Sequence, residues 1–194
     1  MNIKIILKEL KHHIPFTASA TLIAILFVLL FRSFDTKTAF EIIHPVHVIA
    51  SAIVTSAIYY KHKKNISIAI IIGLTGSILI GSISDILLPY LGALIFNFKP
   101  EFHLPIIKET LIILSAAFIG SIIGITTKIT KFPHFIHVFL SVFASLFYLI
   151  SFAQIDSTGL ILSFFIVFIA VLIPCCISDI IYPLFFIDNK KKTL

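Results

Sequence analysis

Six apolar stretches follow one another along this chain, each close to the length that crosses the hydrocarbon core of a bilayer. Short polar or charged breaks separate them and leave no room for a separate soluble domain. We expect helices in all six stretches, because lipid offers the backbone no other hydrogen-bond partners. The sequence therefore predicts an all-α integral membrane protein with a single membrane domain. The expected spans lie at about 14–31, 43–60, 66–88, 106–126, 135–153 and 159–182.

Basic residues are distributed unequally between the breaks. The net charge is +6, and eleven of the fifteen Lys and Arg residues fall at the two ends of the chain and after the second and fourth stretches. The other four fall in the breaks on the opposite side. The positive-inside rule then predicts a multi-pass protein of the cell membrane with both termini in the cytoplasm. The basic composition is therefore interpreted as a topology signal and not as a nucleic-acid-binding surface.

An internal repeat divides the chain into two halves, at about 10–96 and 100–188. Each half reads H-[IL]-P, then H-x-x-H-V-x-x-S, then I-S-D-I-x-x-P. Agreement between apolar positions carries little weight in a membrane protein, whereas six of the eight histidines fall into register. A shift of ninety residues, increased to ninety-four in the last segment, aligns the following pairs: His13 with His103, His44 with His134, His47 with His137, and Asp85 with Asp179.

The number of spans in each half determines how the halves are related. Each half holds three spans, so the second half enters the membrane from the opposite side and the two repeats are inverted. Inverted repeats around a pseudo-two-fold axis in the membrane plane recur in transporters, because exchanging the conformations of the halves opens a site to alternate sides. By analogy, the repeat favours a transporter.

Histidines and aspartates form two equivalent sets in this topology. Two histidines spaced three apart lie on one helical face and can direct both imidazoles at one ion, and a carboxylate from a neighbouring span completes a site. Such ligands suit a divalent transition metal, namely zinc, manganese, iron, cobalt or nickel. Without a metal, the same residues serve as interfacial hydrogen-bonding groups or as a proton relay. The expected sets are His44, His47, Asp85 and His103 at the outer face, and His13, His134, His137 and Asp179 at the inner face.

Small residues and cysteines are interpreted mainly as packing groups. Gly120 and Gly124 have the spacing that lets two helices approach closely. Cys175 and Cys176 are adjacent and are expected to be free thiols. They precede Asp179 by one turn, so they are able to add sulfur to the inner site, but the other half has no equivalent cysteine.

Three functions remain open from the sequence. The leading hypothesis is a small secondary transporter or permease for a divalent transition-metal cation, with proton coupling if the ligands release protons as the ion binds. The alternative is an intramembrane zinc-dependent hydrolase acting on a lipid. Haem ligation is disfavoured, because histidines three apart on one helix do not bracket a porphyrin. The sequence contains no nucleotide-binding motif. The small size suggests a homodimer.

Overall fold

The computed structural model describes residues 3–31, 35–153, 155, 157–176 and 181–187, without the side chains of 3–13, 131, 133, 157, 158 and 176. Within these ranges the chain is helical and contains no strand. The elements are α1 (Ile3–Leu30), α2 (Thr36–His62), α3 (Ile66–Ser82), the π-helical turn η1 (Ile83–Leu87), α4 (Leu88–Ile95), α5 (Pro105–Lys108), α6 (Thr110–Thr127), α7 (Lys131–Phe152), α8 (Ser157–Cys176) and α9 (Tyr182–Phe185).

Helices form at all six predicted stretches, and four of them have the length and composition of membrane spans. Among the described residues, those four are Thr36–His62, Ile66–Ile95, Thr110–Thr127 and His134–Phe152. Parts of α1 and α8 form shorter apolar helices, at Ile14–Leu30 and Gly159–Cys175. The all-helical fold class is therefore confirmed, together with its membrane-helix character.

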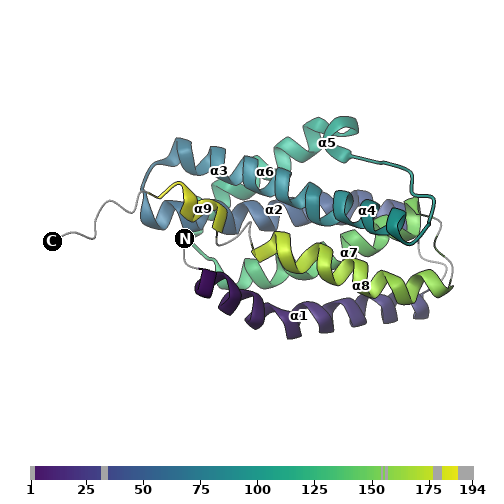
Figure 1. Cartoon of the computed structure of the whole chain (residues 1–194). Coiled ribbons are helices and arrows are strands. Elements are labelled where there is room, and N and C mark those ends of the chain that lie inside the picture. The colour runs from purple at the N-terminus through teal and green to yellow at the C-terminus, as the bar shows by residue number, and fades with distance from the viewer. Residues whose placement is uncertain (1–2, 32–34, 154, 156, 177–180, 188–194) are drawn as a thin grey trace.

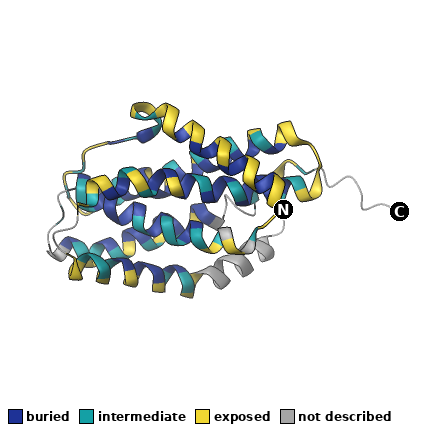
Figure 2. Cartoon of the chain, turned by 180° about the vertical axis from the view of Figure 1, so that it is seen from behind, coloured by how far each residue is buried: buried dark blue, intermediate teal, exposed yellow. Residues whose placement is uncertain are grey.

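The surface of the bundle is apolar, whereas its interior contains many polar groups. On α8, Ile161, Phe165 and Ile169 recur at every fourth position and are each more than half exposed. Buried serines such as Ser56 and Ser121 lie between the helices instead. Figure 2 shows the exposed residues along the outer edges of the helices and the buried ones facing inward. This distribution suits a protein whose solvent is lipid, because apolar side chains gain nothing there from burial.

Helix α2 lies at the centre of the bundle and packs against α3, α6 and α7. Helix α1 packs against α7 and α8, and α7 also packs against α8. Figure 1 shows these long helices running roughly along one direction. Residues from both halves of the sequence therefore meet around α2 and α7.

The first turns of α2 and α3 are capped by side chains. The Asp35 carboxylate accepts hydrogen bonds from the backbone N–H groups of Lys37 and Thr38 and from the Thr38 hydroxyl. The bond from the Thr38 side chain is the main reason that the pKa of Asp35 is lowered. Asn65 caps α3 by accepting from the N–H of Ile68. Both caps satisfy backbone donors that a helix leaves free at its start.

Close approach between α6 and α2 depends on two glycines. A Cβ atom at Gly120 would meet the carbonyl oxygen of Ile49, and one at Gly124 would meet that of Ile53. These neighbours are backbone atoms, which are unable to move aside like the end of a flexible side chain. The predicted small-residue contact is thus a helix crossing within one chain.

Gly120→Ala is expected to destabilise the bundle, because overpacking against a backbone costs about 1–3 kcal/mol. Gly81→Ala is the matched control, since a Cβ there would lie 3.7 Å from its nearest neighbours in ordinary contact. Thermal unfolding in detergent should show a lower melting temperature for Gly120→Ala and no loss for Gly81→Ala. Equal melting temperatures would contradict the tight crossing.

Candidate functional site

Asp85 is positioned by a π-helical turn that its own sequence motif creates. Pro89 has no N–H to donate to the carbonyl of Asp85, four residues earlier. The N–H of Leu88 bonds instead to the carbonyl of Ile83, five residues earlier. Single π-helical turns inside α-helices are frequent at functional sites, because the extra residue re-aims the side chains around it. The side chain of Asp85 is completely buried.

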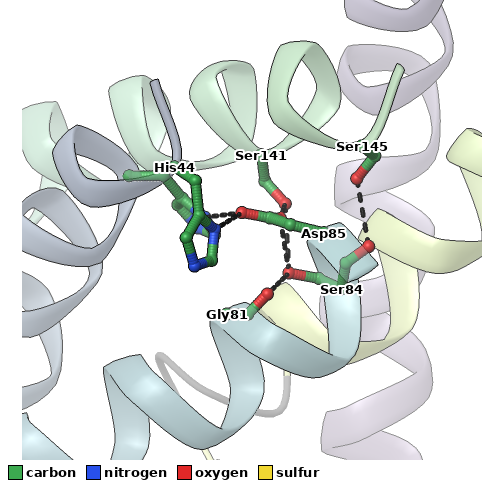
Figure 3. A network of polar contacts seen from close by, with 7 residues as sticks. His44, Gly81, Ser84, Asp85, Ser141 and Ser145 are labelled. Atoms are coloured by element: carbon green, nitrogen blue, oxygen red, sulfur yellow. Dashed lines mark hydrogen bonds and ion pairs between the residues drawn. The ribbon is translucent and has the colours of Figure 1, made fainter. Parts of the chain in front are cut away.

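Two histidines from α2 converge on one oxygen of this carboxylate. The Nδ1 atoms of His44 and His47 lie 2.8 Å and 2.6 Å from Asp85 Oδ2. The histidine side chains are each 1% exposed. Figure 3 shows His44 directed at the carboxylate from the side of α2. The predicted spacing of three residues does place both imidazoles on the face of α2 that meets Asp85.

The other carboxylate oxygen is held by serines. The hydroxyls of Ser84 and Ser141 lie 2.8 Å and 2.7 Å from Asp85 Oδ1. Ser141 belongs to α7, so this contact joins the two halves of the chain (Figure 3). Ser145, one turn further along α7, donates to the backbone carbonyl of Ser84 at 3.0 Å. Helix α7 therefore fixes both Asp85 and the residue before it.

The hydrogen-bond pattern determines which nitrogen of each histidine is protonated. With two imidazoles and two hydroxyls around it, the Asp85 carboxylate acts as an acceptor. Both Nδ1 atoms then carry hydrogen, which leaves Nε2 of each ring as the nitrogen available to a ligand. Nε2 of His47 is buried and has no hydrogen-bond partner among the described residues. A carboxylate behind a histidine is the arrangement that orients imidazoles toward metal ions in proteins.

A second group of potential ligands lies against the first. The ring of His137 stacks on that of His47, with centroids 4.9 Å apart and planes 14° apart. Cys175 from α8 completes a buried group with these two histidines, in which one ligand atom of each residue lies within 4.8 Å of the others. His134 lies edge-on to His137, with ring centroids 5.8 Å apart.

The structure brings most of the predicted residues together, but not as two distant sets. His47 of the expected outer set contacts His137 of the expected inner set. Among the described residues, His103 joins neither ligand group; its ring contacts Phe40 and stacks on Phe152. The side chain of His13 and the whole of Asp179 lie outside the described residues.

Sequence reasoning missed the serines and underrated one cysteine. The predicted sets contain no serine, yet the Ser84 hydroxyl bonds to the Asp85 carboxylate. The available signal was the repeated H-x-x-H-V-x-x-S motif, in which Ser141 follows His137 by four residues and so shares its helical face. Cys175 was also interpreted mainly as a packing group, and only the approach of α8 to α2 and α7 makes it a possible ligand.

His103 is a buried histidine in the connection between α4 and α5. Burial lowers its pKa below the ordinary value of 6.5, and Lys108 adds to this effect. Its Nε2 atom is buried and has no hydrogen-bond partner within the described part of the chain. The folded state therefore favours the neutral ring.

The charge state of His103 makes folding acid-sensitive. Because its pKa is lower in the folded state, its contribution to stability is fully present above pH 6.5 and is lost as the pH falls below that value. His103→Phe keeps an aromatic ring on Phe152 but removes the group that titrates. Between about pH 7.5 and pH 5.5, the melting temperature of this variant should therefore fall less than that of the wild type. His62→Phe, which changes an exposed histidine, is the control. An unchanged acid sensitivity in His103→Phe would contradict this account.

Removing the carboxylate is expected to destabilise the site from its centre. Asp85→Ala leaves the two Nδ1–H groups unpaired, at a cost of about 1–3 kcal/mol for each. Ser141→Ala removes one donor and should cost about 1 kcal/mol. Ser163→Ala is the control, because the Ser163 hydroxyl bonds to the Gly159 carbonyl of its own helix. In detergent, Ser163→Ala should have the highest melting temperature of the three variants, Ser141→Ala a lower one and Asp85→Ala the lowest. The reversed order would refute the network.

The site thus combines imidazole, carboxylate, hydroxyl and thiol groups in a buried position where α2, α7, α8 and η1 meet. Its donor set suits a metal ion or a proton, since both bind to imidazole nitrogen and carboxylate oxygen. Comparison with protein families, with curated proteins and with solved structures found no match for this chain. Its function therefore has to be derived from the chemistry of the site itself.

Proposed function

We propose that this chain is a small secondary transporter for a divalent transition-metal cation. The observation that carries the proposal is the buried group of His44, His47 and Asp85, tied through Ser141 to the other half of the chain. Ionisable residues within membrane spans are costly and usually mark a substrate or ion pathway. In this proposal the group is the central ion-binding site.

The packing of the helices supports an arrangement as two inverted repeats with six spans. In this arrangement α1 exchanges with α6, α2 with α7, and α3 with α8. The contact of α2 with α6 then corresponds to the contact of α7 with α1. The contact of α2 with α3 corresponds to the contact of α7 with α8. The contact of α3 with α6 corresponds to the contact of α8 with α1. Every contact in this exchange is present in the bundle. A transporter of this design changes access by swapping the conformations of its halves.

The equivalent histidines of the two repeats meet where such an exchange needs a common site. His47 and His137 occupy matching positions in the repeats, and their rings stack on each other. An ion bound near this pair would lie close to the pseudo-two-fold axis. It would then remain in place while the helices around it open to one side or the other.

Burial favours transport over lipid hydrolysis. A lipid hydrolase has to bring the scissile bond of a large substrate to its activated water. The side chains of His44, His47 and Asp85 are at most 1% exposed, which suits an occluded ion better than a lipid headgroup. The sign of the loop charges supports an orientation in the cell membrane with both termini in the cytoplasm.

Metal content is the first test of this proposal. Protein purified in detergent without chelator and loaded with zinc should hold the metal stoichiometrically by elemental mass spectrometry. The double variant His44→Ala, His47→Ala should lose most of it, whereas His62→Ala, an exposed histidine on the same helix, should not. Absence of metal from the wild type after loading with zinc, manganese and iron would overturn the proposal and favour a proton relay.

Flux measurements then separate transport from mere binding. Proteoliposomes containing an ion-sensitive dye should take up zinc faster with the wild type than with the double histidine variant, by about tenfold or more for an effect of at least 1.4 kcal/mol. The rate should saturate with zinc concentration. Stoichiometric binding without saturable flux would leave a metal site but would reject the transporter.

A further inference from the structure

His47, His137 and Cys175 form a second buried group, which shares His47 with the hydrogen-bond network around Asp85. All three side chains are buried, with Cys175 only 2% exposed. They come from α2, α7 and α8, so three separate helices deliver one potential ligand each. Two imidazoles and a thiol are a common partial ligand set for a tetrahedral ion.

His47 can serve this second group only through Nε2. Its Nδ1 atom lies 2.6 Å from Asp85 Oδ2, which is a hydrogen-bond distance and too short for two ligands of the same ion. Its Nε2 atom is buried and lacks a hydrogen-bond partner among the described residues. Burying an unpaired polar atom costs free energy, so the position is most easily explained by a ligand that it binds.

The geometry requires only a small closure around an ion. One ligand atom of each residue lies within 4.8 Å of the others. A tetrahedral ion with bonds of about 2.0 Å to nitrogen and about 2.3 Å to sulfur holds its ligand atoms roughly 3.5 Å apart. Binding an ion would therefore bring these ligand atoms closer together by about 1 Å.

We propose that His47, His137 and Cys175 form a second coordination position for the transported ion, next to the position at His44 and Asp85. The proposal rests on the transporter function, and it narrows the cargo. A thiolate ligand favours zinc and other borderline or soft divalent ions such as cobalt and cadmium, and it disfavours manganese and magnesium. His47 belongs to both groups, so its ring connects the two positions.

Binding at the second position includes a proton balance. The Cys175 S–H bond breaks, a bond forms between Sγ and the ion, and the proton leaves to solvent. No oxidant or reductant takes part. One proton per ion is therefore released at this position, while the two imidazoles bind as neutral ligands.

Cobalt spectroscopy tests the thiolate directly in the purified full-length protein. Cobalt(II) bound by a thiolate shows an intense ligand-to-metal charge-transfer band in the near ultraviolet, in addition to its visible d–d bands. The wild type and the control Cys176→Ser should show this band, and Cys175→Ser should lose it while retaining d–d absorption. His137→Gln should keep the band and bind cobalt more weakly, which gives a second variant if Cys175→Ser does not remain monodisperse. A band that persists in Cys175→Ser would overturn the proposal.

Selectivity connects the site to its cargo. Competition between zinc and manganese is measured on detergent-purified protein. The preference for zinc over manganese should be at least tenfold smaller in Cys175→Ser than in the wild type, a difference of about 1.4 kcal/mol. An unchanged preference would overturn the proposal. The two hypotheses fail separately: zinc flux with no cobalt charge-transfer band in the wild type rejects the second position alone, whereas the band without flux rejects the transporter and retains the thiolate site.

Discussion

The hydrogen bonds around the Asp85 carboxylate are the interaction on which the rest of this structure depends. One oxygen receives His44 and His47 from α2, and the other receives Ser84 and Ser141, the latter from α7. A buried charge is tolerated only if it is fully paired or hydrogen-bonded. The network therefore fixes the π-helical turn, the register of α2 and the contact between the two halves at the same time.

The network also separates two roles that a histidine can have. Nδ1 of His47 is used for structure, because it binds Asp85, whereas Nε2 faces no hydrogen-bond partner among the described residues. Orientation by a carboxylate fixes the ring and places its available lone pair at Nε2 when a ligand binds. The stability of the fold and the capacity to bind an ion therefore depend on opposite edges of the same ring.

Much of this site was predictable because polar residues are rare in apolar spans. The spacing of His44 and His47 and the repeated I-S-D-I-x-x-P motif indicate which side chains face inward, and the structure does join both histidines to Asp85. Sequence topology placed His137 in a different set from His47. It gave no measure of depth, so it missed that the two rings stack in one place.

The sequence by itself determined the helical fold class, the approximate positions of the helices and the residue types of the site, because apolar length and helical periodicity are local properties. Only the tertiary structure decided that Ser141 completes the carboxylate network, that Cys175 approaches His137, and that His103 stacks on Phe152. These contacts join residues far apart in the chain. They depend on how α7 and α8 cross α2, which results from side-chain packing in three dimensions and is not encoded in any single segment.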